Sequence, residues 1–457
     1  MHATKHFHND LLNSMSDEEI QKYQEKRLRV QIKYCYEKSP FYRKKFADIG
    51  ASPDDIKTLE DLRALPVFLD KDQERKNAAE SLDRENHPFG THLCAPVEDI
   101  FLTGTTSGTT GIPTFTYSFT RNDIELIAPA LGHRFYFNGI RKGDRVLFIF
   151  ALGIYATTMS LWGIRHIGAL PIDIDARAGS EAMLSFAELT RPKFMATTVS
   201  LAEYLIQKAP GVSGKEVGEL GFKGLMLTGE IGVGIPEVKR RIESAYGCPV
   251  YDYWAPAGHA VAISCGSDEY TGMHGIAPDL CTSFDDMVDP TTKNAVPVED
   301  GAIGEIVITS LKREAVPLLK YATGDVVQIF TGPCPHCGFP GKRIKLIGRS
   351  DDMLIVKGVN VYPSAIKTVI ESFEPRVTGE MRIVLDEPPP RIVPPIKLKI
   401  EYGQDTRQSD LEGLAQEISR ATHDKLKIRP TIDWVGPGQL DKSQRKTPVF
   451  EKRYEKK

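Results

Sequence analysis

The stretch from Thr105 to Thr114, Thr-Thr-Ser-Gly-Thr-Thr-Gly-Ile-Pro-Thr, has the residue types of a loop that binds an anion. Glycine lets the main chain approach a ligand closely, and successive N–H groups together with hydroxyls form a donor-rich concavity. The stretch is not a GxxxxGK[ST] phosphate loop, because Ile112 follows its last glycine. Taken alone, it is also typical of an ordinary polar turn.

Four further residues have the types and grouping of a zinc site. Cys334 and Cys337 form a Cys-x-x-Cys pair, and Cys265 and His274 lie upstream of it. Tetrahedral zinc takes four thiolate or imidazole ligands, and pairs of this kind build structural sites. We therefore expect these four residues to hold a structural zinc ion, with His336 as an alternative to His274. A pair of reduced thiols on a loop stays open as the other interpretation.

The elements that position these residues belong to a chain of 457 residues that is 41% hydrophobic and 26% charged. This composition predicts a soluble protein of two or three domains. A formal net charge of −3 gives no support to a nucleic-acid or membrane partner. The seven cysteines are an odd number and favour a reducing, cytoplasmic location. The uncharged segment 146–164 contains polar residues, so we expect a strand followed by a helix instead of a membrane span.

Apolar runs alternate with amphipathic helices between about residues 100 and 310. This alternation predicts an α/β fold with layered, largely parallel sheets and helices. We expect strands at 146–150, 225–228 and 306–308 and a helix at 236–246. Upstream, a capping box formed by Ser16 and Glu19 predicts a helix over 16–37.

The pattern of apolar and polar residues changes near residue 350, which predicts a smaller α+β domain at the C-terminus. Its residues 396–400 alternate between apolar and charged side chains, as expected of a strand. A helix is expected to begin at Ser409, and the proline-rich run 388–395 is expected to be a loop.

A series of short motifs follows the first loop in a fixed order. Each motif is weak alone, since it could form a turn or a linker. As a set they resemble the adenylate-forming superfamily of acyl-CoA ligases, and within it the phenylacetate-CoA ligase family, over nearly the whole chain. The motifs are Leu227-Thr-Gly-Glu230, Tyr251-Asp-Tyr-Trp254, Tyr321-Ala-Thr-Gly-Asp325, Gly348-Arg-Ser-Asp-Asp-Met353, Lys357-Gly-Val-Asn-Val361 and a lysine-rich end containing Lys446.

The resemblance implies an AMP-forming reaction in two steps. A carboxylate attacks the α-phosphate of ATP, and CoA thiol then displaces AMP from the acyl-adenylate. The implied phosphate-binding residues are Ser107, Gly108, Thr109, Thr110 and Gly111. The implied adenine- and ribose-binding residues are Thr228, Gly229, Glu230, Tyr251, Asp252, Asp325 and Arg349, with Asp325 holding both ribose hydroxyls.

The resemblance also divides the chain into residues 1–348, which bind ATP and the acid, and a mobile domain of residues 349–457. Lys446 is the implied catalytic residue, since a cation there stabilises the charge that builds during adenylation. Asp351 matches the hinge between the domains, and Lys357 and Gly358 match the tunnel for CoA.

Two positions depart from the family pattern. Ile112 replaces the lysine that usually follows the glycine-rich loop, and Ala257 replaces a glutamate that helps to position Mg²⁺. We therefore expect Mg²⁺ to rely on the hydroxyls of Thr109 or Thr110, on phosphate oxygens and on water.

The resemblance places the acid near five residues, namely Tyr136, Phe137, Trp254, Ala255 and His259. Aromatic walls suit an aryl acid such as phenylacetate or benzoate. His133, Arg134 and His259 could pair with a second carboxylate, which would suit an aromatic dicarboxylate such as a phthalate isomer.

The predicted function is an aryl-acid:CoA ligase of aromatic compound degradation. Its partners are the acid, ATP and CoA, with Mg²⁺ and structural Zn²⁺ as metals and a homodimer as one possible assembly. Two alternatives stay open. The enzyme could pass its acyl group to an amine or a carrier protein, or the chain could be a nucleotide-binding scaffold without activity, as the loss of the glutamate at Ala257 suggests.

Overall fold

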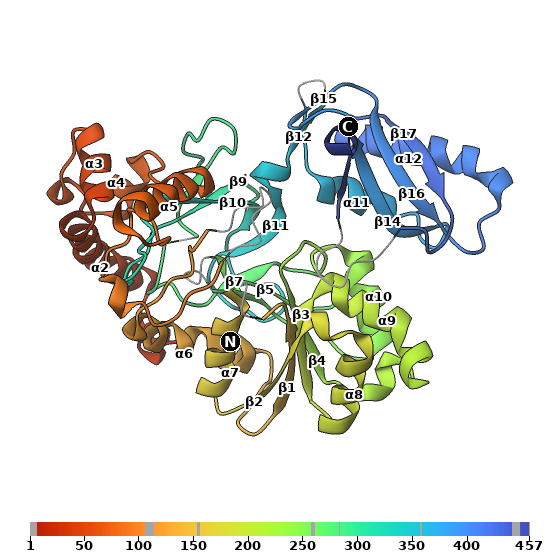
Figure 1. The fold of residues 1–457 in the computed structure, drawn as a ribbon, viewed down its shortest axis with the longest axis horizontal. Coiled ribbons are helices and arrows are strands. Elements are labelled where there is room, and N and C mark those ends of the chain that lie inside the picture. Colours follow the sequence, from red (N-terminus) through yellow and green to blue (C-terminus); the bar gives the residue numbers. More distant parts are fainter. Residues whose placement is uncertain are drawn as a thin grey trace.

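The structure, a computed structural model, describes residues 7–105, 114–152, 156–256, 261–282, 284–356, 359–440 and 448–456. Within these residues an 11-stranded sheet runs through the larger part of the chain (Figure 1). Its first five strands, in spatial order, are parallel. They are β2 (Leu170–Asp175), β1 (Arg145–Phe150), β3 (Phe194–Thr198), β4 (Gly224–Thr228) and β5 (Val250–Trp254).

The same sheet continues with antiparallel strands. These are β6 (Ala262–Ser264), β7 (Met273–Gly275), β11 (Arg343–Arg349), β10 (Tyr321–Phe330), β9 (Ile303–Ile308) and β8 (Met287–Val288). The predicted α/β fold is therefore confirmed, and its parallel half ends at Trp254. The predicted strand at 306–308 lies within β9 and pairs only with antiparallel neighbours.

Helices cover both faces of the parallel strands (Figure 1). On one face are α8 (Ser180–Thr190), α9 (Val199–Ser213) and α10 (Pro236–Tyr246), and on the other are α6 (Arg121–Phe137) and α7 (Met159–His166). Side chains of β1 alternate between the two cores: Leu147 and Ile149 pack with α8 and α9, whereas Phe148 and Phe150 pack with α6 and α7. A strand buried on both faces explains the uninterrupted apolar run from which β1 was predicted.

Three N-terminal helices, α2 (Asp17–Lys38), α3 (Pro40–Asp48) and α4 (Leu59–Ala64), form a third core with the segment 311–321. They are flanked in the sequence by α1 (Asp10–Ser14), whose Leu12 belongs to another hydrophobic cluster, and by α5 (Lys71–Glu85). The predicted capping box is present at α2, where Ser16 and Glu19 bond to each other's backbone N–H groups. Helix α5 matters most for the site, because its first turn reaches toward the main sheet.

The C-terminal part contains two small sheets and two helices (Figure 1, blue). One sheet contains β12 (Leu354–Val356), β13 (Val359–Val361) and β15 (Arg391–Ile392), and the other contains β14 (Val377–Leu385), β16 (Ile396–Tyr402), β17 (Pro430–Val435) and β18 (Phe450–Lys452). The helices α11 (Pro363–Glu371) and α12 (Leu411–Leu426) pack on the second sheet.

Two details in this part differ from prediction. The run 388–395 is not only loop, because Arg391 and Ile392 pair with β12. The last helix begins at Leu411 after a single 3-10 turn, and Ser409 bonds to the side chain of Asp410 in place of capping the helix. Among the described residues no helix is long and apolar enough to cross a membrane, and the segment from Val146 forms β1 and α7 as expected.

Candidate active site

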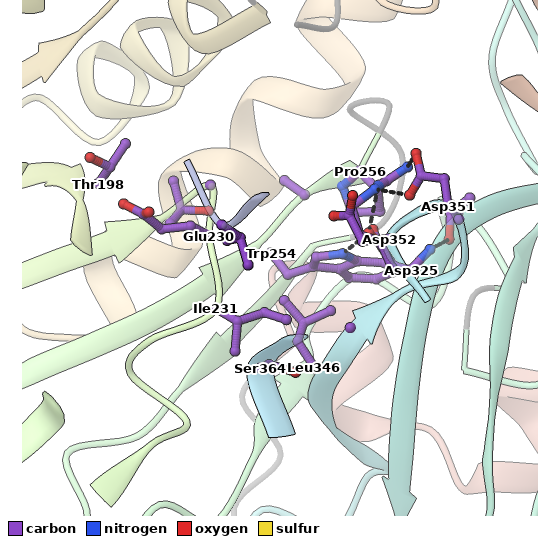
Figure 2. Close-up of a pocket in the computed structure, with 18 of the residues that line it drawn as sticks. Thr198, Glu230, Ile231, Trp254, Pro256, Asp325, Leu346, Asp351, Asp352 and Ser364 are labelled. Carbon is purple, nitrogen blue, oxygen red and sulfur yellow. Dashed lines mark hydrogen bonds and ion pairs between the residues drawn. The ribbon is translucent and has the colours of Figure 1, made fainter. Parts of the chain in front are cut away.

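A cavity of about 900 Å³ lies at the carboxyl ends of the parallel strands (Figure 2). Phe150, Thr198, Thr228 and Trp254 end four of these strands and line it. Loops at the carboxyl ends of parallel strands are the usual ligand sites of such sheets, because the strands all point their ends toward one edge. The fold therefore gathers at one place motifs that lie far apart in the sequence.

Asp325 is held in the cavity by two donors from different elements. The indole Nε1–H of Trp254 donates to one carboxylate oxygen at 2.8 Å, and the guanidinium of Arg349 donates to the other at 2.9 Å (Figure 2). Arg349 also donates its Nε–H to Asp351 at 2.8 Å. Burial opposes the charge on Arg349, but the two carboxylates outweigh it and raise its pKa. Asp325, Arg349 and Asp351, which come from two separate motifs, thus form one charged group.

The opposite wall carries the motif Thr228-Gly-Glu230. Thr228 donates its hydroxyl to the Tyr253 carbonyl at 2.6 Å, and Gly229 adopts a φ of +88° that favours glycine. Glu230 accepts two hydrogen bonds from Ser200 at the start of α9, one from the backbone N–H and one from the hydroxyl, both at 2.6 Å. The carboxylate of Glu230 is therefore fixed in position before any ligand binds.

Asp252 is a buried carboxyl group in the same wall. Its backbone N–H donates to Ser264 at 2.8 Å, and the Tyr270 hydroxyl donates to its side chain at 2.7 Å. Burial raises its pKa to about 7, although the bond from Tyr270 acts in the opposite direction. Asp252 can therefore exchange a proton near neutral pH.

Three residues of the predicted site lie outside the cavity. Tyr251 lies near the start of β5, on the same face as Tyr253, and its ring packs against Gly224 and Gly266. Tyr136 is 47% exposed, with the guanidinium of Arg141 over its ring. Phe137 packs beside His274. The assignment of Tyr136 and Phe137 to the acyl pocket is thus corrected, because this side of α6 faces away from the cavity.

Other predicted residues lie outside the part of the chain that the structure describes. They are Ser107, Gly108, Thr109, Thr110, Gly111, Ile112, Ala257, His259, Lys357, Gly358 and Lys446. Their flanking residues Thr105, Pro256 and Pro448 line the cavity.

Sequence reasoning missed the cationic residues that other elements bring to the cavity. Lys71, in the first turn of α5, lies 3.2 Å from Thr116 and 3.1 Å from Glu74. Lys367 of α11 lines the cavity from the C-terminal part, and nearby carboxylates raise its pKa although burial opposes this. Among 58 lysines and arginines, nothing in the local sequence singles out Lys71 and Lys367.

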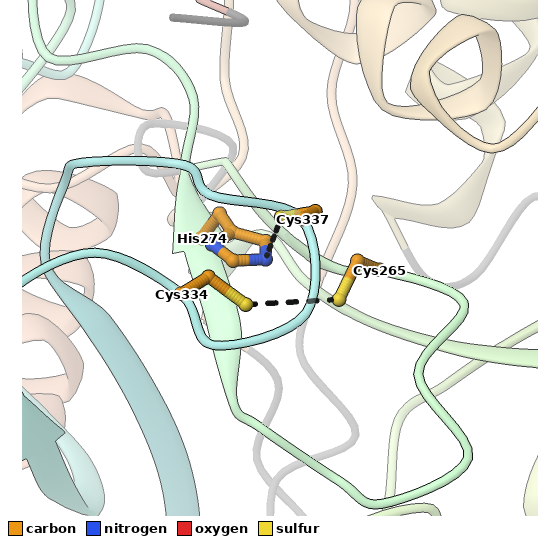
Figure 3. A group of neighbouring side chains, drawn as sticks. All are labelled: Cys265, His274, Cys334 and Cys337. Carbon is orange, nitrogen blue, oxygen red and sulfur yellow. Dashed lines mark hydrogen bonds between the residues drawn. The ribbon is translucent and has the colours of Figure 1, made fainter. Parts of the chain in front are cut away.

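The four predicted zinc ligands form a cluster in a different part of the fold (Figure 3). Their ligand atoms all lie within 4.8 Å of one another. The sulfurs of Cys265 and Cys334 are 4.0 Å apart, and Cys337 Sγ is 3.5 Å from His274 Nε2. Hydrogen bonds from Cys337 and His274 lower the pKa of Cys265 to about 3, which favours a thiolate.

The donor set fits a tetrahedral zinc ion. Two ligands at 2.3 Å from a tetrahedral centre are about 3.8 Å apart, close to the sulfur separation observed. His274 is fully buried, and its Nδ1 has no hydrogen-bond partner among the described residues. His336 is exposed and is not in the cluster, so the alternative ligand is excluded. The other cysteines, Cys35, Cys94, Cys248 and Cys281, are buried away from this cluster, and none of the seven forms a disulfide bond.

Comparisons with known proteins agree with this geometry. A model of the AMP-binding enzyme C-terminal domain matches residues 358–453. The phenylacetate-coenzyme A ligase of Pseudomonas putida is 30% identical over 367 residues, which cover 78% of this chain and 77% of the relative. That of Thermus thermophilus is 27% identical over 452 residues, which cover 95% of this chain and 96% of the relative.

The solved structure of 2-hydroxyisobutyryl-CoA ligase with its acyl-AMP in the postadenylation state has a TM-score of 0.84 at 28% identity, covering 96% of this chain and 91% of that one. The same ligase in the thioesterification state gives a TM-score of 0.67. The present arrangement of the chain is thus more similar to the postadenylation state.

The fold and the cavity define the class of this protein, that of the adenylate-forming acid–thiol ligases. Sequence identity and the aligned share of the chain then identify its family within this class. The chain belongs to the phenylacetate-CoA ligase family.

Proposed function

We propose that this protein joins an aryl carboxylic acid to CoA through an acyl-adenylate, with cleavage of ATP to AMP and pyrophosphate. The observation that carries the proposal is the cavity in which Asp325 and Arg349 face the Thr228–Glu230 motif. A phenylacetate-CoA ligase aligns with 95% of the chain. This coverage supports both half-reactions, adenylation and thioester formation. Trp254 and Ala255 line the cavity and suit the flat ring of an aryl acid.

Asp325 is proposed to bind the ribose of ATP. An ionised carboxylate is an acceptor only, and two ribose hydroxyls offer the matching donors. Trp254 and Arg349 hold the carboxylate in place. Thr228, Gly229, Glu230 and Asp252 would then flank the adenine from the opposite wall. Tyr251 does not line the cavity, so it can support this wall only indirectly.

The phosphates of ATP are proposed to lie against residues 107–111, with Lys71 as an added cation. Lys71 contacts Thr116, shortly after that loop, and lines the cavity beside Thr105. A cation at this place compensates for the lysine that Ile112 replaces. It would stabilise the negative charge that collects on pyrophosphate as the leaving group.

Mg²⁺ enters this proposal only as a counter-ion that neutralises the phosphates. The cavity carboxylates of Asp325 and Glu230 bind protein donors, and both are assigned to the nucleoside in this proposal. Thr109 or Thr110, phosphate oxygens and water stay the proposed ligands, and no step is routed through the ion.

Zinc is proposed to be structural. Cys265, His274, Cys334 and Cys337 would hold it, and it would fix the loop before β11 against β7 and the N-terminal segment near Phe7. None of these four residues lines the cavity, so we assign the site no role in the chemistry.

Lys446 is proposed as the catalytic lysine, Asp351 as the hinge, and Lys357 and Gly358 as part of the CoA tunnel. The division into residues 1–348 and 349–457 belongs to the same proposal. It is supported by the turn at 350–352 after β11 and by the state-dependent TM-scores of the related ligase. Arg349 bonds to both Asp325 and Asp351. Nucleotide binding at Asp325 would therefore change the contacts of the proposed hinge residue Asp351.

A cytoplasmic location is proposed, supported by seven cysteines that form no disulfide bond in the structure. A homodimer is proposed as the assembly, supported by the exposed aromatic pair of Phe101 and Trp162, whose rings are 5.9 Å apart. Light scattering of the purified protein tests it.

Acid-dependent exchange of pyrophosphate into ATP tests the adenylation step. We expect exchange with phenylacetate or benzoate, and its absence with every aryl acid would overturn the proposal. A second assay with and without CoA tests the acceptor. Thioester must form only with CoA, and release of an amide from a supplied amine without CoA would assign a different acceptor.

A further inference from the structure

Arg134 is a fully buried arginine in the wall of the proposed acyl-binding cavity. It lies on α6, one turn before the end of the helix. The cavity wall around it also contains Phe150, Thr157, Ser160 and Tyr253. An arginine in such an apolar wall requires an explanation, because a buried charge is costly unless it is paired.

The packing of α6 on α7 fixes the position of this side chain. Gly132 and Gly163 face each other across the two helices. A Cβ atom on Gly132 would lie 2.7 Å from the Gly163 carbonyl oxygen, so only glycine permits this approach. The close contact brings Arg134 within 2.5 Å of the Ser160 hydroxyl, to which its NH2 group donates.

The remaining surroundings of Arg134 leave most of its donors unused. Its guanidinium lies over the rings of Phe135 and Tyr253, at 4.7 and 4.3 Å from their centroids. Its Nε and NH1 groups have no hydrogen-bond partner among the described residues. A guanidinium carries five N–H donors, so a single bond to Ser160 satisfies only a minority of them.

Arg313 offers a comparison, because it is a buried arginine of the same fold that bonds to backbone carbonyls and lies near carboxylates. It also lies over an aromatic ring, at 4.0 Å from the centroid of Phe119. Its NH2 group donates to two backbone carbonyls at 2.7 and 3.1 Å, and the charges of Asp123 and Glu74 act on it. No described carboxylate acts on Arg134, whose pKa burial lowers to about 10, so it stays cationic at neutral pH.

We propose that Arg134 binds a second carboxylate on the acyl substrate, so that the preferred acid is an aromatic dicarboxylate. This inference rests on the proposed ligase activity and adds the substrate class. The two free donor groups can form a paired hydrogen bond with a carboxylate, and the charge pair would compensate for burial of the guanidinium. The rings of Phe150 and Tyr253 provide the apolar contact for the aryl ring between its two carboxyl groups.

The experiment compares kcat/KM for benzoate, phenylacetate, phthalate, isophthalate and terephthalate in the wild type, Arg134→Met and Arg134→Lys. We expect at least one dicarboxylate to exceed benzoate by about tenfold or more in the wild type. Arg134→Met should lower the value for that diacid by roughly 100-fold and change the value for benzoate by less than about threefold. Arg134→Lys, which keeps the charge, should recover part of the loss.

Arg313→Met is the matched control. It removes a buried arginine outside the cavity, so it should lower the thermal midpoint without changing the ratio of diacid to benzoate activity. Activity with monoacids but none with diacids would overturn the inference and leave the ligase proposal intact. Loss of diacid and benzoate activity in equal proportion in both Arg134 variants would overturn it as well. Absence of activity with every acid would instead reject the ligase proposal.

Discussion

Arg241 on α10 forms an ion pair with Glu374, which lies beyond α11 in the C-terminal part of the chain. The same guanidinium donates its Nε–H to Glu203 of α9 at 2.9 Å. It also lies 3.9 Å from the buried carboxyl group of Glu371, whose pKa burial raises to about 7. Because α9 and α10 cover the main sheet, this network joins the C-terminal part to the larger part in the observed arrangement.

We expect Arg241→Gln to weaken this arrangement and to slow acyl-adenylate formation about fivefold, equivalent to ~1 kcal/mol. The observed arrangement is more similar to the postadenylation state of the related ligase, so thioester formation from a supplied acyl-adenylate should change little. Single-turnover measurements of the two half-reactions check this. Arg240→Gln is the control, because Arg240 is 68% exposed and pairs with Glu237 of its own helix. Equal effects of the two substitutions would contradict the role of the network.

The raised pKa of Asp252 predicts that the stability of the protein depends on pH. Its pKa in the folded protein, about 7, lies above its ordinary value of 3.8, so the folded state binds more protons between these values. The free energy of unfolding should therefore decrease as pH rises from about 4 to about 7, by an amount of up to ~4 kcal/mol from this group. Asp252→Asn should remove that decrease. Urea unfolding at pH 5 and pH 8 measures it, and an unchanged difference between the two pH values in the variant would refute the assignment.

Metal removal should destabilise the protein. We expect about one equivalent of zinc per chain, and Cys334→Ser should lose it and unfold at a temperature lower by about 5 °C or more. Elemental analysis and thermal unfolding measure the two effects. Cys248→Ser is the control, since Cys248 is buried away from the cluster and should keep the metal. A purified protein with full stability and no bound metal would exclude a structural zinc.

Substitution of Lys71 should change KM for ATP more than KM for the acid. We expect Lys71→Met to raise KM for ATP about tenfold, because it removes a cation beside the proposed phosphate site, and to leave KM for the acid nearly constant. Lys76→Met on the exposed side of the same helix should have no effect. Steady-state kinetics with each substrate varied in turn separates these outcomes. A change in KM for the acid alone would place Lys71 elsewhere in the mechanism.

Much of the fold follows from local patterns. The capping box at Ser16, the apolar run of β1 and the amphipathic α10 all form the predicted elements, because propensity, capping and burial agree there. The antiparallel half of the main sheet was not predicted. Strand direction depends on long-range pairing, such as that of β10 with β9 and β11, and short strands carry no sign of it.

For the site, the sequence by itself determined the order of the motifs, the identity of the chemical groups and the cysteines of the metal-ligand cluster, whereas the structure selected His274 over His336. Motif order and residue type are properties of the chain. The tertiary structure decided which side chains share the cavity, because this depends on how helices are rotated and packed. On α6 the contact of Gly132 with Gly163 turns Arg134 toward the cavity and leaves Tyr136 at the surface, and no local pattern distinguishes these two positions.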